Sequence, residues 1–320
     1  MKPLAPCRFR NRDLGNGFRF EGLENGLDLQ NHLVRTGADF PSLIFAYAAR
    51  GGVRSIATLV AQGLNSLGLN VFQPKSAVPL AALSAAVAKR NIPIGLYLDE
   101  DDAGFWTLTP LAAHGGPVEH PIFEGGSPVP LKQTGVLGET EIIEPYLRAL
   151  EGLLDATPGE GPRLAGLDCP FPEIDRRLLD PNDPASRTIL GERRPDGPHA
   201  RISPDGQGLE IEWPIGKRLS TDQLVQMVGR YLHEQRAGRG TLIGPPGARD
   251  VVQSLSANPE ESEKIEVIEV RDGPLEMSYR AGFSDLLLGW WDSGILAHQG
   301  HGPFGDGLLT LAYLLESWSS

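Results

Sequence analysis

The sequence is poor in the residues that build disulfide frameworks, zinc sites and membrane spans. Its 320 residues include only two cysteines, Cys7 and Cys169, and two cysteines alone make neither a disulfide framework nor a zinc site. No apolar run approaches the roughly 20 residues that a membrane-spanning helix needs, and residues 1–13 lack the apolar segment of a signal peptide. We therefore expect a cytoplasmic protein without a membrane partner.

The sequence also lacks runs of lysine and arginine. The formal net charge is −12 and the basic residues are scattered, so a surface that follows a phosphate backbone, and with it a nucleic-acid partner, is not expected. Glycine (39 residues) and proline (27 residues) are abundant, which predicts many loops between short elements. A chain of this length buries a sizeable core and is expected to form two or three domains.

Strand and helix patterns alternate in the first third of the chain. Apolar runs at 43–47, 69–72 and 94–98 predict strands, and helical spacing over 54–67 and 79–89 predicts two helices between them. This alternation is typical of a parallel sheet with crossover helices. In such sheets, ligands gather at the carboxyl ends of the strands.

Four adjacent carboxylates, Asp99 to Asp102, directly follow the strand predicted at 94–98. They therefore lie at the end of the sheet where ligands are expected. Such a cluster can bind a metal, supply acid–base groups, mimic a phosphate or form a solvated loop. The residues alone leave these interpretations open.

The remaining two thirds of the chain also carry strand and helix patterns. A capping box at 220–223 precedes one of the helices, and the strand near 209–213 alternates as a half-exposed strand does. The predicted helices span 139–154, 220–232 and 307–318, and the predicted strands lie near 209–213, 241–243, 265–270, 286–288 and 295–297.

Motifs near the C-terminus resemble functional sites but fit structural roles better. Residues 300–305 fit G-x-G-x-x-G, yet too few residues follow for the rest of a dinucleotide-binding unit. His298 and His301 are expected to be surface or turn histidines rather than metal ligands. Trp290 and Trp291 are either packed or contact a ligand or partner.

Six segments, taken in chain order, resemble the motifs of the α-D-phosphohexomutases, the phosphoglucomutase/phosphomannomutase family. They are 14–19 (LGNGFR, for FGTxGxRG), 46–50 (AYAAR, for GxDTR), the strand end at Asp99 (for TASHNP), 203–208 (SPDGQG, for DxDGDR), 289–294 (GWWDSG, for GGEESG) and 306–316 (for the DG-helix). The resemblance implies an α/β fold of three αβα domains with mixed or parallel sheets. We place these domains at 1–130, 131–238 and 239–320.

Members of this family are expected to move a phosphoryl group between C1 and C6 of a hexose, through a phosphoserine and with Mg²⁺. Here Asp99 stands at the position of the nucleophilic serine and Glu100 at that of the following histidine, although phosphoserine chemistry needs a hydroxyl oxygen. Among the three metal carboxylates, Asp205 is retained, while Ser203 and Gln207 stand at the other two positions. Nucleophile and metal are both needed to position and neutralise a transferred phosphoryl group.

The sugar-reading loop and the far end of the sequence depart from the family pattern too. Trp291 and Asp292 replace the two glutamates, and Ser293 is kept. The sequence ends at Ser320, where the fourth domain of the family, with its phosphate-binding loop, is expected to begin. Asp99 is interpreted as a fixed mimic of phosphoserine, as part of a solvated loop, or as a cation ligand.

These departures predict a protein that binds but does not catalyse: a scaffold or regulatory protein with a protein partner or a second copy of itself. The alternatives are a residual or altered sugar-phosphate enzyme and a sensor of hexose phosphates. No cofactor is expected; the alternative is Mg²⁺ bound by Asp99 and Asp205. The candidate ligand-binding residues are Arg50, Asp99, Glu100, Asp205, Trp291, Asp292 and Ser293.

Overall fold

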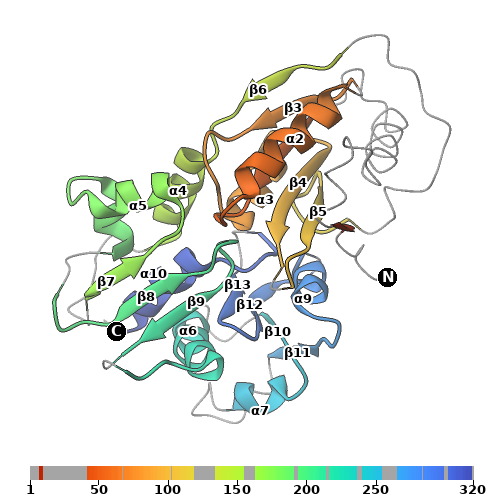
Figure 1. The fold of residues 1–320 in the computed structure, drawn as a ribbon. Helices are drawn as coiled ribbons and strands as arrows, with labels where there is room; N and C mark the ends of the chain where they lie inside the picture. Colours follow the sequence, from red (N-terminus) through yellow and green to blue (C-terminus); the bar gives the residue numbers. More distant parts are fainter. Residues whose placement is uncertain are drawn as a thin grey trace. The chain divides into compact units, whose positions relative to one another are not determined.

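The computed structural model forms two compact units, which we call unit 1 (Met1–Ile142) and unit 2 (Ile143–Ser320) (Figure 1). Both units combine mixed β-sheets with helices. The domain boundaries predicted at residues 130 and 238 remain a prediction. The structure describes residues 7–9, 42–66, 68–101, 103–118, 134–154, 163–190, 194–213, 216–235, 240–253, 265–282, 284–298 and 302–318.

The described residues of unit 1 form a six-stranded sheet in the order β1-β5-β4-β2-β3-β6. Strands β2, β3, β4 and β6 run parallel to one another, whereas β5 is antiparallel to both β4 and β1. The three strands and two helices predicted between residues 43 and 98 are all present. The elements are β1 (Cys7–Phe9), β2 (Ser42–Tyr47), α2 (Val53–Ser66), β3 (Asn70–Gln73), α3 (Leu80–Arg90), β4 (Ile94–Glu100), β5 (Trp106–Ala112) and β6 (Leu137–Glu139).

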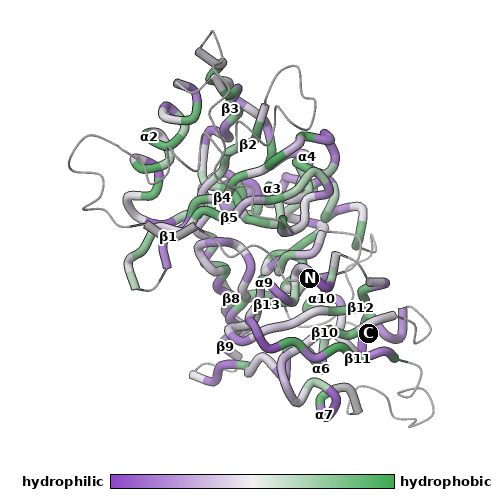
Figure 2. Tube along the Cα trace, turned by 90° about the vertical axis from the view of Figure 1, so that its right-hand side faces the viewer, coloured by the Kyte–Doolittle hydropathy of each residue, from purple (hydrophilic) through white to green (hydrophobic). Residues whose placement is uncertain are grey.

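The core of unit 1 lies between its central strands and α2. Strands β2 and β4 are buried and apolar along most of their length (Figure 2), as expected of central strands whose sheet is covered by helices, here α2 and α3. Helix α2 turns one apolar stripe toward the sheet, since its buried residues recur at helical spacing. These residues are Val53, Ala57, Val60, Ala61 and Leu64.

Unit 2 contains a three-stranded sheet, β7-β8-β9, and a four-stranded sheet, β11-β10-β12-β13. A bridge between Gly208 and Ile295 joins the start of β9 to β13. The strands are β7 (Gly166–Asp168), β8 (His199–Ile202), β9 (Leu209–Glu212), β10 (Thr241–Gly244), β11 (Glu266–Glu269), β12 (Leu286–Trp291) and β13 (Ile295–His298). The helices are α4 (Ile143–Glu151), α5 (Pro172–Leu179), the π-helix η2 (Ser186–Leu190), α6 (Thr221–Gln235), α7 (Ala248–Gln253), α9 (Pro274–Ala281) and α10 (Gly307–Ser317).

Two local predictions for unit 2 are confirmed. The alternation in β9 buries Leu209 and Ile211 and exposes Glu210 and Glu212. The capping box at the start of α6 is formed by reciprocal bonds between Ser220 and Gln223: the Ser220 amide donates to Gln223 Oε1 (2.8 Å) and the Gln223 amide to Ser220 Oγ (3.2 Å).

The helix predicted over 139–154 is shorter in the structure. Residues 137–139 form strand β6, which pairs with β3 in the sheet of unit 1, so the helix begins at Ile143. Within the described segments, no helix is both long enough and apolar enough to cross a bilayer.

Candidate functional site

The carboxylate cluster of unit 1 lies in a β-hairpin rather than at a crossover. Strands β4 and β5 pair through Asp99 with Thr107 and Glu100 with Trp106. The Arg50 Nε donates to Asp99 Oδ1 at 2.9 Å, and the Glu100 amide donates to the same oxygen at 2.8 Å. The structure therefore brings Arg50 and Asp99 together, as partly buried partners with 31% and 18% of their side chains exposed.

Asp101 closes the turn of this hairpin, which we call the carboxylate hairpin (residues 99–105). Its Oδ1 accepts the amides of Ala103 and Phe105, both at 3.0 Å. Such side-chain bonds to nearby amides stabilise turns. Asp102 falls outside the described residues. The cluster is thus divided between an ion pair at Asp99 and a turn at Asp101.

Residues 203–208 of unit 2, which we call the Asp205 loop, are closed by their own side chains. The Ser203 hydroxyl donates to Asp205 Oδ1, and the Gln207 amide donates to the same oxygen at 3.1 Å. The Gln207 Nε2 donates to Asp205 Oδ2 at 2.8 Å. The Gly208 amide donates to Ser203 Oγ at 2.7 Å. Both carboxylate oxygens of Asp205 therefore accept bonds from the loop itself.

Backbone contacts fix the Asp205 loop against two neighbouring segments of unit 2. The Gly307 amide donates to the Gly206 carbonyl (2.8 Å), and the Leu209 amide to the Gly294 carbonyl (3.1 Å). A Cβ at Gly294 would lie 2.0 Å from the Leu209 oxygen, so this close approach needs glycine. The motif segments at 203–208, 289–294 and 306–307 thus meet in the fold.

The residues of the 289–294 segment differ in burial. Trp290 is 1% exposed and its ring lies over Gly244, so its interpretation as a contact residue is wrong and that as a packed residue is confirmed. Trp291 is partly buried, while Asp292 and Ser293 are exposed. Ser293 has a left-handed backbone, with φ 64°, which is uncommon for a residue with a side chain.

Asp306, the first residue of the segment that resembles the DG-helix, is a buried polar group at the start of α10. Asp306 accepts the amides of Leu308 and Leu309 at 3.0 Å and the hydroxyl of Tyr146 at 3.0 Å. Burial, and then the Asp306 charge, raise the pKa of Tyr146 well above its usual value. His298 is buried in β13 and bonded to Thr310 at 2.7 Å, so the expectation of a surface or turn histidine is wrong for it.

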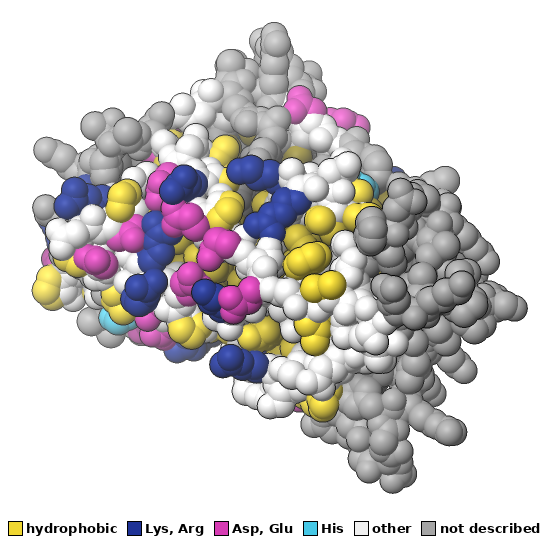
Figure 3. Space-filling model, turned by 90° about the horizontal axis from the view of Figure 1, so that it is seen from above, with side chains coloured by type: hydrophobic (Ala, Val, Ile, Leu, Met, Phe, Trp, Pro, Cys, Tyr) yellow, Lys and Arg dark blue, Asp and Glu magenta, His cyan; other side chains and the backbone are white. Residues whose placement is uncertain are grey.

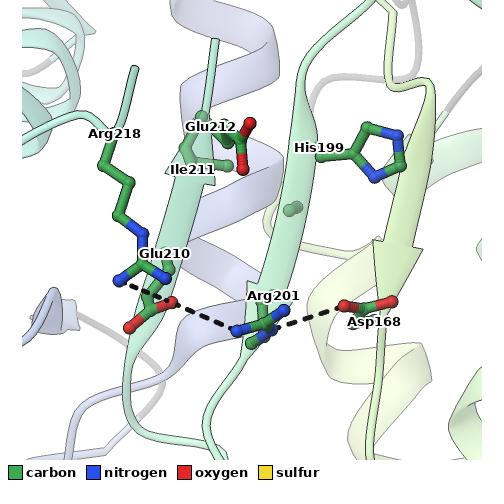
Figure 4. Close-up of a pocket in the computed structure, with 8 residues that line it drawn as sticks. Asp168, His199, Arg201, Glu210, Ile211, Glu212 and Arg218 are labelled. Carbon is green, nitrogen blue, oxygen red and sulfur yellow. Dashed lines mark hydrogen bonds and ion pairs between the residues drawn. The ribbon is translucent and has the colours of Figure 1, made fainter. Parts of the chain in front are cut away.

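The outer face of the three-stranded sheet forms an open pocket of about 340 Å³. Charged residues of opposite sign alternate across its strands (Figure 4): Arg201 pairs with Asp168 at 3.3 Å and Glu210 at 3.8 Å, and Arg218 pairs with Glu210 at 3.4 Å. All four side chains are exposed to solvent by about half or more. The alternation around residue 210 could have indicated this face. Its neutralised charges favour no single class of ligand.

The Asp205 loop does not fit a Mg²⁺ site. Mg²⁺ prefers several oxygen ligands in octahedral geometry, whereas this loop offers one carboxylate whose oxygens already accept O–H and N–H groups. Across the described part of the chain, no three His, Cys, Asp or Glu side chains gather in a metal-binding group. Asp99 and Asp205 belong to different units, and a metal site shared by them stays a prediction.

Comparison with solved structures identifies the class of fold. The chain is similar to a protein described as a phosphomannomutase from Thermus thermophilus (TM-score 0.73, 19% identity, 98% of this chain and 78% of that chain covered). It is also similar to a phosphoglucomutase/phosphomannomutase family protein from Burkholderia thailandensis (0.68, 14%, 98% and 75%). A third similar structure is parafusin, a phosphoglucomutase from Paramecium in its open form (0.59, 12%, 99% and 71%).

These likenesses show that the chain has the fold of the phosphohexomutases, in agreement with the predicted fold class. No protein-family model matches the sequence, and no curated protein matches it. The motif resemblance at residues 14–19 falls outside the described residues. The roles of Arg50, Glu100, Asp292 and Ser293 in ligand binding remain predictions.

Proposed function

We propose that this chain is a non-catalytic protein built on the phosphohexomutase fold, acting as a binding or scaffold protein. One observation carries the proposal: the two polar loops that the motif resemblance aligns with the nucleophile and with the metal ligands are both closed by bonds within the chain. Asp99 is bonded to Arg50, and Asp205 is bonded to Ser203 and Gln207.

The chemistry at Asp99 supports the same proposal. A phosphoserine mechanism needs a hydroxyl oxygen that accepts and releases a phosphoryl group. Asp99 instead offers a carboxylate, whose charge Arg50 balances at 2.9 Å. The resemblance assigns this position to a phosphoserine, which would carry about −1.5 to −2 charges, whereas the Arg50–Asp99 pair places one carboxylate there with its charge balanced.

The test is a coupled assay with glucose 1-phosphate and Mg²⁺, performed on the full chain and on Asp99→Asn. If the proposal holds, neither protein forms glucose 6-phosphate faster than a control reaction without protein. Magnesium-dependent formation of glucose 6-phosphate by the wild-type chain, lost in Asp99→Asn, would instead establish a sugar-phosphate enzyme. Calorimetric binding of glucose 1-phosphate without turnover would favour a sensor.

A surface on unit 1 is the proposed contact for a second copy of the chain. Three large apolar side chains, Leu59, Val136 and Leu137, are 43%, 58% and 49% exposed, and α2 and β6 are in contact. Hydrophobic side chains also reach the surface between charged ones on the face drawn in Figure 3. Exposed apolar groups of this kind tend to mark interfaces.

A second copy is the proposed occupant because β6 is the last described strand of its sheet. The open edge of a strand can pair with the same edge of another copy around a two-fold axis, which closes the assembly. Light scattering of the full chain is expected to give the mass of a dimer, and Leu137→Ser is expected to give a monomer. Leu179→Ser, equally exposed at 49% but in unit 2, is the matched control that should remain dimeric. A monodisperse wild-type monomer would contradict this contact.

A further inference from the structure

The Asp205 loop carries hydrogen-bond donors where the resemblance implies metal ligands. Ser203 and Gln207 stand at the positions of two family carboxylates. Their side chains both donate to Asp205: the hydroxyl to Oδ1 and the amide Nε2 to Oδ2, the latter at 2.8 Å. A carboxylate only accepts hydrogen bonds, so the amide of Gln207 must turn its N–H toward Asp205.

We infer that the Asp205 loop is held without a metal, with the Gln207 amide and the Ser203 hydroxyl satisfying the carboxylate that a cation would otherwise satisfy. Hydrogen bonds to an ionised acceptor are stronger than neutral ones. The bonds reach both oxygens of Asp205 and include the Gln207 backbone amide at 3.1 Å. The inference deepens the proposed function and rests on it, since it explains how the fold keeps this loop in shape without a catalytic metal.

The surroundings of the loop make this closed arrangement resistant to opening. The Gly206 carbonyl accepts the Gly307 amide at 2.8 Å, and the Gly208 amide donates to Ser203 Oγ at 2.7 Å. A cation approaching Asp205 would meet the hydrogens of N–H and O–H groups, which repel it. Binding would require Gln207 to rotate away and these bonds to break, for which one carboxylate offers little compensation.

The sharpest test replaces one atom group: Gln207→Glu exchanges the donating amide for a second carboxylate of the same shape. Two carboxylates at 2.8 Å repel one another. In EDTA, the Tm of the full-length variant is expected to fall by roughly 3–8 °C, and Mn²⁺ or Mg²⁺ is expected to restore most of it. The Tm of the wild-type chain is expected to be the same in EDTA and in Mg²⁺.

Two further variants separate this effect from charge and from simple loss of packing. Gln223→Glu makes the same chemical change in the capping box of α6, where glutamate accepts the Ser220 amide equally well, so neither a loss of Tm nor a rescue by cations is expected. Gln207→Ala removes the donor without adding charge, and its smaller loss of Tm should not respond to cations.

The inference is overturned if Mg²⁺ raises the Tm of the wild-type chain and Asp205→Asn removes that rise, because the loop would then hold a cation. It is also overturned if Gln207→Glu melts like the wild type in EDTA. A wild-type chain that converts glucose 1-phosphate while Gln207→Glu behaves as expected would contradict the proposed function alone. The two proposals can therefore fail separately.

Discussion

The carboxylate hairpin of unit 1 and the Asp205 loop of unit 2 are both closed, but by different means. The hairpin is held by its own residues: the backbone bond from the Asp101 amide to the Phe105 carbonyl at 2.8 Å, the Arg50–Asp99 ion pair and the turn bonds of Asp101. The Asp205 loop depends in addition on backbone contacts with 293–295 and 306–307, which pass through glycines. The hairpin therefore needs mainly local contacts, whereas the Asp205 loop also requires two distant segments of unit 2 to keep their shape.

This difference predicts different sensitivities to mutation. Partly exposed ion pairs contribute about 0–1 kcal/mol to stability. Buried hydrogen bonds and close backbone contacts cost more when disrupted, because the groups left behind are desolvated or clash. Substitutions around the Asp205 loop should therefore lower the free energy of unfolding more than substitutions in the carboxylate hairpin.

The largest effect is expected for Asp306→Ala. The substitution removes the cap of α10 and leaves the buried Tyr146 hydroxyl without its carboxylate partner. Loss of a cap and of a buried hydrogen bond together should lower the free energy of unfolding by about 3 kcal/mol, measured by urea denaturation. Asp306→Asn, which keeps an acceptor oxygen for the helix amides, should lose less. Equal stability of wild type and Asp306→Ala would show that this support is not needed.

A second prediction concerns the reactivity of Cys169, which directly follows β7 in unit 2. Burial raises the pKa of Cys169 to about 12, and its thiol donates weakly to the Phe171 carbonyl at 3.9 Å. In a Cys7→Ser background, Cys169 should react with iodoacetamide at pH 8 at least about 100-fold more slowly in the native chain than in urea, because the thiolate is the reactive form. Equal rates would contradict the raised pKa of Cys169.

The same shift gives the sign of a pH dependence. In the folded chain the Cys169 thiol keeps its proton up to about pH 12, whereas the usual pKa of a cysteine thiol is 9.0. Its contribution to stability is therefore complete below pH 9.0 and is lost as the pH rises toward 12. The wild-type chain should therefore lose stability as the pH rises above 9.0, and Cys169→Ser should make this loss smaller.

Much of the fold could be predicted because its strands are short apolar runs and its helices show apolar spacing. The sequence pattern does not predict strand β5, because Pro110 within it argues against a strand. Residues 137–139 were not recognised as a strand, and residue 139 was assigned to the start of a helix, because nothing local reveals that they pair with β3. Both segments become strands by pairing with other strands of the sheet, and local patterns in a single sequence do not reveal that pairing.

The candidate site could be predicted only in part. The motif resemblance pointed to the segments that meet around Asp205, and the acidic run pointed to the hairpin with Asp99. The contact between Tyr146 and Asp306 spans 160 residues, and Trp290 is buried against Gly244 on another strand. Neither contact leaves a local pattern, so burial and hydrogen bonding at these positions became clear only in the fold.

A smaller effect, which isolates the close approach of glycine, is expected for Gly294→Ala. The new Cβ would lie 2.0 Å from the Leu209 oxygen, at a residue with φ +69°. Gly247→Ala is the matched control, because Gly247 has φ +92° and no atom within 4 Å of its Cβ position. The left-handed backbone alone should cost each variant about 1 kcal/mol.

The clash in Gly294→Ala should add at least about 1 kcal/mol to that cost, measured by urea denaturation as the difference between the two variants. A difference near zero would mean that the turn moves away from Leu209 without penalty. The Asp205 loop would then be no more constrained than the carboxylate hairpin, and the comparison between them would fail.

The smallest effect is expected in the carboxylate hairpin itself. A double-mutant cycle with Arg50→Gln and Asp99→Asn should give a coupling energy of about 0.5 kcal/mol, since the pair is only partly buried. Asp99→Asn keeps an oxygen for the Glu100 amide, so the cycle reports the ion pair and not the backbone bond. The coupling should decrease in about 1 M salt, where exposed charges are screened. A coupling of about 2 kcal/mol or more that salt leaves unchanged would show that side-chain charges hold this hairpin as firmly as backbone contacts hold the Asp205 loop.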